Sequence, residues 1–422
     1  LNALSELVEE TGGLIHMDQL PVGDPTLSAK EIVGNESQER MGIVIREEDI
    51  EHIRQIADRE RAPFYVVGET TGDHRFVFEQ TDGVKPIDLA MEDMFGKAPR
   101  TVMTDRTVKE TYEDVTYDQT QLDEYVERVL QLEAVACKDW LTNKVDRSVT
   151  GKIARQQCQG EIQLPLSDCG VVALDYRGCA GIATSIGHAP QAALVDPAAG
   201  SVLSIAEALT NIVWAPLSEG LDSVSLSANW MWPCKNEGED ARLYRAVEAC
   251  SDFACSLGIN IPTGKDSLSM TQKYGKDKVY SPGTVIISAG AEVSDIRKVV
   301  SPVLRTGIDS TVYYIDFSFD KLKLGGSAFA QSLDKIGKEV PTVQDSEYFA
   351  NAFNAVQELI NKELILAGHD ISAGGMITTM LEMNFANTEG GLEVSLDEIP
   401  EKDLVKILFS ENPGILIQVE KT

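Results

Sequence analysis

Two polar side chains stand one helical turn apart in the segment AEALTNI. Glu207 and Asn211 are spaced i and i+4, so on a helix they share one face, and their neighbours are Ala, Leu and Ile. A carboxylate and an amide oxygen are hard-oxygen ligands of the kind that Mg²⁺ takes, together with water and phosphate. The alternative is a solvated stripe on an amphipathic helix, which is the commoner arrangement.

Two aspartates stand at the ends of apolar segments. Asp168 in LPLSDCGVV lies where an apolar strand meets a turn of small residues, a place that suits a metal ligand but also an ordinary turn-forming Asp. Asp370 in HDISAGG follows the apolar ELILAG and precedes a glycine turn and the helical MITTMLEM. We expect backbone N–H groups and the helix N-terminus of that turn to face a phosphate or a metal. No GK[ST] follows, so the segment is not a Walker A motif.

The segment PTGKDSLSM offers a cation next to small residues. It follows the apolar strand LGINI, and we expect it on a strand-to-loop edge. Lys265 beside Gly264, with the Ser267 hydroxyl, suits a phosphate in an otherwise acidic protein. A plain surface loop is the alternative.

Three hydrogen-bonding side chains follow one another in GNESQER. Glu36, Ser37 and Gln38 stand between EIV and MGIVI, which we interpret as two apolar strand-like runs. Buried polar groups there must be satisfied or face a ligand. The corresponding stretch near the end of the chain, SENPG, lacks the triad, so the fold alone does not demand it.

An internal repeat positions these motifs. GGLIHMDQLP at residues 12–21 and GGLEVSLDEIP at 390–400 each follow a helical stretch and precede an apolar segment with a glutamate, Glu36 or Glu411. We interpret this as a duplication. The HDISAGG loop precedes the second copy, and its counterpart would lie upstream of Leu1, so we expect the chain to be an internal piece of a longer protein.

Patterns of apolar residues divide the chain into four stretches. Helix and strand periods alternate, which predicts α/β layers with mixed sheets. We expect a helix over about 121–142, one after the Asp196 cap, one over about 240–257, and one from Asp345 with Phe349, Phe353, Val356 and Ile360 inward. The predicted domains are 1–98, a connector 99–150, 151–297 and 298–422.

Charge and cysteine usage limit the function classes. The formal net charge is −30 over 422 residues, a balance that disfavours nucleic acid and anionic membranes as partners. No run approaches eighteen apolar residues. Seven scattered cysteines without CxxC, and five histidines without HxxxH, indicate a reducing, cytoplasmic compartment and no transition metal.

Together these segments resemble one family. GNESQER, the stretch LTNKVDRSVTGKIARQQCQGEIQLPLSDC, AEALTNI, PTGKDSLSM and HDISAGG are similar, in order, to the large phosphoribosylformylglycinamidine synthases. The resemblance implies two pseudo-symmetric halves, each with N- and C-terminal subdomains like those of aminoimidazole ribonucleotide synthetase. Residues 1–98 would then be the first half's C-terminal subdomain, 151–297 the second half's N-terminal one, and 298–422 its C-terminal one.

The family's reaction joins formylglycinamide ribonucleotide, ATP and glutamine-derived ammonia through an iminophosphate to give the amidine. The resemblance also assigns roles to residues. It implies substrate contacts at Glu36, Ser37, Gln38 and Ser267, nucleotide contacts at Ser167, Ser372, Gly264 and Lys265, and Mg²⁺ ligands at Asp168, Glu207, Asn211 and Asp370. The last four, with Ser167 and Ser372, would form an auxiliary ATP or ADP site that is structural in large members.

Two family parts have no counterpart in this sequence. These are the first half's N-terminal subdomain and the glutaminase domain, so we expect no catalytic residue and no turnover from this chain alone. Two other readings stay open: another ATP-dependent synthetase of the same superfamily, such as aminoimidazole ribonucleotide synthetase or selenophosphate synthase, or a non-catalytic Mg-nucleotide-binding module.

Overall fold

The computed structural model describes residues 1–35, 39–96, 102–145, 147 and 149–421, and the chain divides into two compact units, 1–102 and 103–422. The boundaries predicted at 98/99, 150/151 and 297/298 stay predictions. No helix among the described residues is long and apolar enough to cross a membrane.

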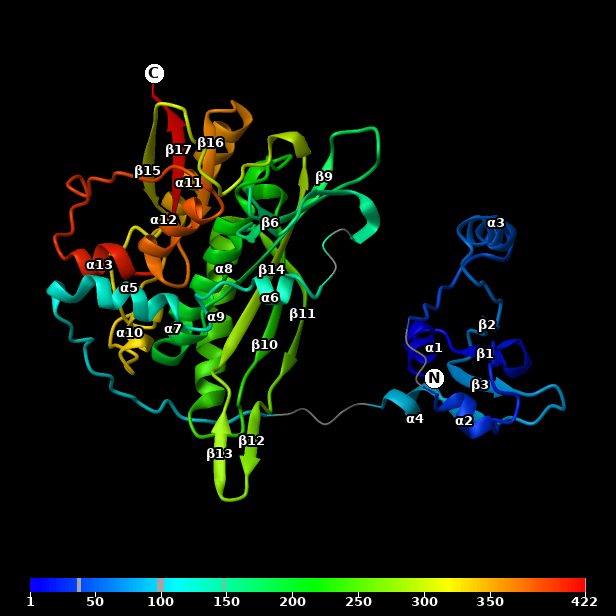
Figure 1. The fold of residues 1–422 in the computed structure, drawn as a ribbon. Helices are drawn as coiled ribbons and strands as arrows, with labels where there is room; N and C mark the ends of the chain where they lie inside the picture. Colours follow the sequence, from blue (N-terminus) through cyan, green and yellow to red (C-terminus); the bar gives the residue numbers. More distant parts are fainter. Residues whose placement is uncertain (36–38, 97–101, 146, 148, 422) are drawn as a thin grey trace. The chain divides into compact units, whose positions relative to one another are not determined.

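The first unit is built around a four-stranded sheet in the order β2-β1-β3-β4 (Figure 1). β1 pairs parallel with β3 and antiparallel with β2, and Phe76 and Phe78 of β3 are fully buried in the unit's core. Its elements are α1 Asn2–Leu7, β1 Gly13–His16, α2 Ala29–Val33, α3 Ile50–Glu60, β2 Gly68–Thr70, β3 Arg75–Glu79, β4 Ile87–Ala90 and α4 Met91–Phe95.

The strand-like runs expected around residue 36 are wrong. The first run lies in helix α2, which begins at a capping box of Ser28 and Glu31, and residues 40–46 form neither helix nor strand. A strand needs a hydrogen-bonding partner, and Met41 here is 93% exposed. In the second copy the matching GILIQVE is strand β17 (Gly414–Glu420), paired on both sides.

The second unit holds a six-stranded sheet, order β11-β10-β14-β9-β8-β5, on which helices α8 and α9 pack (Figure 1). Strand β9 alternates buried and exposed residues along its length, as expected for a sheet covered on one face. The strands are β5 Ile153–Arg155, β8 Gly170–Ala173, β9 Gly181–His188, β10 Ser225–Met231, β11 Asn260–Ser267 and β14 Thr284–Val293.

Three of the predicted helices are confirmed with small changes at their ends. α8 (Pro197–Ile212) begins after Asp196, whose side chain accepts two backbone N–H groups. Pro197 occupies the first helical turn, where a missing N–H costs no hydrogen bond. α9 spans Glu239–Leu257, and α11 spans Ser346–Asn361 after its Asp345 cap. The four residues expected to face inward from α11, Phe349, Phe353, Val356 and Ile360, are all buried.

The long connector helix is wrong in its extent. α5 covers Leu122–Leu130, and a separate short helix, α6, covers Asp139–Thr142. Leu132 and Val135, just beyond α5, leave the helical path and pack against a cluster that includes Phe329 and Phe409. Tertiary packing therefore outweighs helix propensity in this stretch.

A second, three-stranded sheet follows, with order β15-β17-β16 and both pairings antiparallel. Its strands are β15 Ser310–Asp316, β16 Ile365–Asp370 and β17. One hydrophobic cluster joins the six-stranded and three-stranded sheets of this unit through Trp214, Phe317 and Phe349. The remaining elements are β6 Cys158–Gln159, β7 Leu164–Pro165, α7 Pro190–Val195, β12 Thr271–Tyr274, β13 Asp277–Tyr280, α10 Ala328–Ser332, α12 Gly375–Phe385 and α13 Leu404–Phe409.

Candidate metal centre

The structure brings Asp168, His369 and Asp370 together. One potential ligand atom of each residue lies within 4.8 Å of the ligand atoms of the other two. His369 and Asp370 end strand β16, and Asp168 lies between β7 and β8. Nδ1 of His369 lies 2.7 Å from Oδ1 of Asp168 and 3.6 Å from Oδ1 of Asp370. All three side chains are at most 7% exposed, so two segments about 200 residues apart in the chain meet in a buried polar site.

Asp168, His369 and Asp370 lie in a cluster that carries more negative than positive charge. Burial lowers the pKa of His369, but Asp168 and Glu382 outweigh it and hold that pKa well above its ordinary value. Burial, and then the neighbouring Asp168 carboxylate, raises the pKa of Asp370 well above its usual range. The pKa of Asp168 is also raised, chiefly by burial. One imidazolium therefore faces several carboxylates that share a poorly solvated place.

The unsatisfied oxygens of this cluster test whether its residues fit a cation. Oδ2 of Asp168 and Oδ2 of Asp370 are buried without a hydrogen bond, and so is Oγ of Ser167 next to them. Buried polar atoms without partners are rare in folded proteins. Carboxylate and hydroxyl oxygens are suitable donors for Mg²⁺, and a divalent cation would favour the ionised form of both aspartates, which burial disfavours. The residues present therefore fit the metal.

Glu207 and Asn211 face strand β9 from helix α8, which also packs against β16. Glu207 accepts the His188 backbone N–H at 2.6 Å, and Nδ2 of Asn211 donates to the Ile186 carbonyl at 3.0 Å. Glu207 does not belong to the cluster of Asp168, His369 and Asp370, yet its negative charge contributes to the raised pKa of Asp370. Within the described residues the structure thus assembles Asp168 and Asp370, with Glu207 and Asn211 on the neighbouring helix.

Two backbone amides of the HDISAGG glycine turn are bonded within the protein. The Gly374 N–H donates to Oε1 of Glu411 at 2.8 Å, and the Gly375 N–H donates to the Ser372 carbonyl at 3.0 Å. These amides are therefore used inside the protein and do not face a ligand. The same Glu411 oxygen also accepts the Ala328 N–H at 2.8 Å. A buried carboxylate thus holds the turn at the start of α12.

Gly264, Lys265 and Ser267 lie in strand β11, which ends at Ser267, so the segment spans the end of a strand and the start of the following loop, as expected. Nζ of Lys265 donates to Oγ of Ser267 at 2.9 Å. A Cβ on Gly264 would lie 2.1 Å from the Ala228 carbonyl oxygen, so the close pairing of β10 and β11 requires glycine there whatever else it does. β11 and β8 are four strand positions apart in the sheet, about 19 Å at ordinary strand spacing, so the structure does not bring these residues to Asp168. Glu36, Ser37 and Gln38 lie outside the described residues.

Two family models cover most of the chain. The AIR synthase related protein C-terminal domain matches residues 1–80 and 311–421, and the FGAR-AT PurM_N-like domain matches 137–292. The match of one model at both ends confirms the internal repeat. The phosphoribosylformylglycinamidine synthases of Dictyostelium discoideum and Homo sapiens are each 37% identical to this chain over all of its length.

This chain belongs to the phosphoribosylformylglycinamidine synthase family. It spans about a third (32%) of the length of those two relatives. PurLQS of Thermotoga maritima has the same fold over the whole chain, with a TM-score of 0.65 at 17% identity and 59% of that protein covered. PurL of T. maritima complexed with ATP gives a TM-score of 0.62 at 17% identity, again over 100% of this chain and 59% of that one. The predicted α/β class with synthetase-like, duplicated subdomains is confirmed.

In this phosphoribosylformylglycinamidine synthase homologue the sequence interpretation missed three charged residues beside the predicted ligands. His369 had a signal, since it stands beside Asp370 in the motif, and Glu411 had one as the repeat partner of Glu36. Glu382, whose Oε2 lies 3.0 Å from Nε2 of His369, is thirteen residues further along in helix α12 and gave no signal that spacing could use.

Proposed function

We propose that this chain forms a Mg²⁺-nucleotide-binding part of a phosphoribosylformylglycinamidine synthase, an ATP-dependent carbon–nitrogen ligase of purine biosynthesis that uses glutamine as amido donor. The observation that carries the proposal is the buried pair Asp168 and Asp370, each with an oxygen that has no hydrogen bond. The family supplies the reaction: formylglycinamide ribonucleotide, ATP and glutamine-derived ammonia give formylglycinamidine ribonucleotide through an iminophosphate.

The chain's own residues have separable tasks in this proposal. Asp168 and Asp370 hold the cation, with Glu207 and Asn211 completing the oxygen donors from α8. When bound, Mg²⁺ neutralises the phosphates of ATP or ADP, which an acidic protein would otherwise repel. His369 fixes the orientation of the Asp168 carboxylate through the 2.7 Å contact. The unpaired hydroxyl of Ser167, and Ser372 in the adjoining turn, are the proposed nucleotide contacts.

Other parts of the proposal rest on the resemblance alone. Glu36, Ser37, Gln38 and Ser267 would contact formylglycinamide ribonucleotide, and Gly264 and Lys265 would contact ATP. The proposed partners are the glutaminase domain and the first half's N-terminal subdomain of the longer enzyme. In the structure the seven cysteines are all free, which supports a reducing compartment such as the cytoplasm.

A second function is favoured by the burial of the site. A nucleotide held by nearly solvent-free carboxylates would exchange slowly and serve as a structural ligand rather than a substrate. Survival of the bound nucleotide through purification, without hydrolysis, distinguishes this from a catalytic site, where the nucleotide turns over with substrate.

The test is extraction of nucleotide from the purified protein by heat denaturation and chromatography, with and without prior EDTA. We expect near-stoichiometric ADP or ATP that is lost when the metal is stripped. Absence of nucleotide, together with no increase in thermal stability on adding Mg-ADP, would reject the site. Release of ammonia from glutamine by this chain would contradict the proposed division of tasks.

A further inference from the structure

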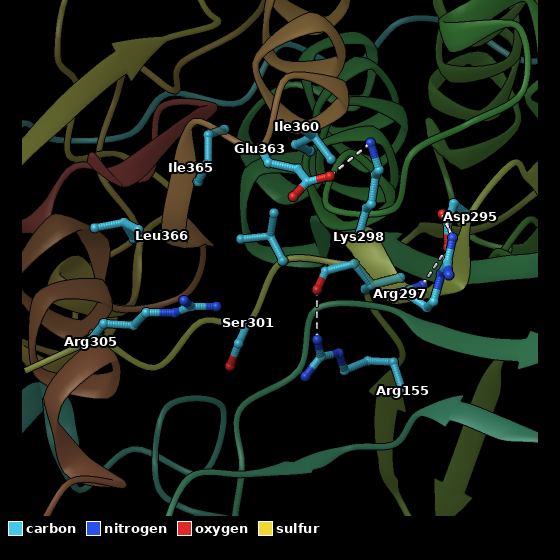
Figure 2. Close-up of a pocket in the computed structure, with 12 residues that line it drawn as sticks. Arg155, Asp295, Arg297, Lys298, Ser301, Arg305, Ile360, Glu363, Ile365 and Leu366 are labelled. Atoms are coloured by element: carbon cyan, nitrogen blue, oxygen red, sulfur yellow. Dashed lines mark hydrogen bonds and ion pairs between the residues drawn. The ribbon is translucent and has the colours of Figure 1, made fainter. Parts of the chain in front are cut away.

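A second polar concavity lies in the 103–422 unit, away from the carboxylates. It encloses about 490 Å³ and is formed by β5, the crossover segment 295–305 between the two sheets, and the residues that lead from α11 into β16 (Figure 2). Four of its lining side chains are basic: Arg155, Arg297, Lys298 and Arg305. Two are acidic, Asp295 and Glu363, so the lining carries a net charge of +2 in a chain of net charge −30.

Two of the four cations are already neutralised. Nη2 of Arg297 lies 2.6 Å from Oδ2 of Asp295, and Nζ of Lys298 lies 2.9 Å from Oε1 of Glu363. Figure 2 shows both pairs on the side of the pocket away from Arg305. They leave no acidic side chain in the lining for the other two cations.

Arg155 and Arg305 are the cations without a carboxylate. Arg155 is half-buried, donates to the carbonyl of Val299 at 2.7 Å and to Oε1 of Gln159 at 2.5 Å, and its Nε has no partner. Burial lowers the pKa of this guanidinium. The guanidinium of Arg305 makes no hydrogen bond or ion pair with any residue that the structure describes. Two guanidinium groups thus line one cavity with hydrogen-bond donors to spare, and the planar fork of Arg fits the oxygens of phosphate.

One wall of the cavity is apolar. Ile360, Ile365 and Leu366 also line the cavity; Ile360 and Ile365 are packed into the hydrophobic core, whereas Leu366 is partly exposed. A phosphate ester would place its organic part against the exposed edge of this wall, which a bare inorganic anion does not use. The two walls together select a ligand with one phosphate group and a compact apolar or flat body.

We propose that this pocket binds a small phosphate monoester, with Arg155 and Arg305 on the phosphate and the Ile360, Ile365 and Leu366 wall on the organic part. The pocket meets β16 at Ile365, whereas the metal centre ends the same strand at Asp370, about 17 Å away at the ordinary rise of a strand. The site is therefore separate from the Mg²⁺-nucleotide site, and it does not rest on the proposed function.

The experiment is titration calorimetry of the chain with inorganic phosphate and with phenyl phosphate, in EDTA and at fixed ionic strength. EDTA removes any phosphate binding that a metal would mediate. We expect saturable binding of both probes, with phenyl phosphate the tighter by several-fold. Arg305→Ala should weaken the binding of phenyl phosphate by about tenfold or more, because hydrogen bonds between charged groups are among the stronger ones.

Three matched variants make the result decisive. Lys276→Ala removes one positive charge from the exposed turn between β12 and β13 and should leave binding unchanged. Asp370→Asn alters the metal centre and should also leave it unchanged. Arg155→Lys keeps the positive charge but loses the planar guanidinium, so it should weaken binding of phenyl phosphate. Circular dichroism should show that the variant is still folded. Absence of saturable binding, equal weakening in Lys276→Ala, or loss in Asp370→Asn would overturn the proposal.

Discussion

The imidazole of His369 lies between two carboxylates from different elements. Its Nδ1 lies 2.7 Å from Oδ1 of Asp168, and its Nε2 lies 3.0 Å from Oε2 of Glu382. Nε2 is hydrogen-bonded to Glu382, whereas Nδ1 makes no hydrogen bond and contacts Asp168 as an ion pair. The raised pKa of His369 keeps the ring protonated. His369 thus ties the segment before β8 to helix α12 across the end of β16.

Replacing His369 by Gln removes the cation and leaves Asp168 as an uncompensated buried charge. Loss of one partner of such a pair destabilises a protein by about 3–5 kcal/mol. The pKa of His369 is raised in the folded state, so its contribution is fully present below its unfolded pKa and is lost only as pH rises through the higher folded pKa. Urea unfolding of wild type and His369→Gln at pH 7 in EDTA should show this loss.

The matched control is His52→Gln on helix α3, an exposed histidine in the other unit. It should leave the urea transition of the 103–422 unit unchanged. Added Mg²⁺ should recover part of the stability lost in His369→Gln, because it supplies the missing positive charge. Equal stability of His369→Gln and wild type would show that the bridge is not formed.

Replacing Asp370 by Asn should have opposite effects with and without metal. The raised pKa of Asp370 means that its ionised form is unfavourable in the folded protein, so an isosteric amide should stabilise the metal-free chain at pH 7. The same change removes a proposed ligand and should abolish retention of nucleotide in Mg²⁺. Thermal melts in EDTA and nucleotide extraction in Mg²⁺ measure the two effects.

Asp277→Asn, on the exposed hairpin strand β13, changes the same chemical group outside the site. It should alter neither measurement. Retention of nucleotide by Asp370→Asn at the wild-type level would remove Asp370 from the ligand set.

Glu411 predicts a specific dependence of stability on pH. Burial raises its pKa to about 7 from a usual 4.5, although the N–H groups of Gly374 and Ala328 partly offset the rise. Because the pKa of Glu411 is higher in the folded than in the unfolded state, its contribution to stability is fully present below pH 4.5. The free energy of unfolding then falls by about 3 kcal/mol as the pH rises to about 7. Glu411→Gln cannot ionise and can still accept both N–H groups, so its unfolding free energy should lack this decline.

Urea unfolding at pH 4.5, 5.5, 6.5 and 7.5, in EDTA, compares the two proteins. Glu398→Gln, at an exposed position, is the control and should follow wild type. A Glu411→Gln variant whose stability falls with pH as steeply as wild type would assign the decline to another group.

The sequence predicted local elements well where the signal was local. The Asp196 and Asp345 caps and the apolar faces of α8 and α11 depend on residues within one or two turns of each other, and both helices are present. The connector helix was predicted too long because Leu132 and Val135 pack against distant Phe329 and Phe409, which no local pattern reveals.

The candidate site was predictable in part, for a similar reason. Asp168 and Asp370 each carried a local signal, but their meeting depends on the packing of β16 beside the segment before β8. Glu382, the spare guanidinium groups of Arg155 and Arg305, and the use of the Gly374 N–H by Glu411 are all set by long-range contacts. Spacing along the chain cannot show whether a turn's amides face a ligand or a buried carboxylate.

Gly368, directly before His369, connects the metal centre to the hydrophobic core. A Cβ there would lie 2.1 Å from Cζ3 of Trp214, a rigid and fully buried ring. Gly368→Ala must therefore displace the ring or strand β16, and overpacking of this kind destabilises a protein by about 1–3 kcal/mol. Because His369 and Asp370 follow on the same strand, Mg²⁺-dependent nucleotide retention should fall as well.

The matched control is Gly391→Ala, whose new Cβ would have no atom within 4 Å. It should behave as wild type in both the thermal melt and the nucleotide extraction. Unchanged stability and retention in Gly368→Ala would show that β16 shifts freely, and that the core does not fix the position of the site.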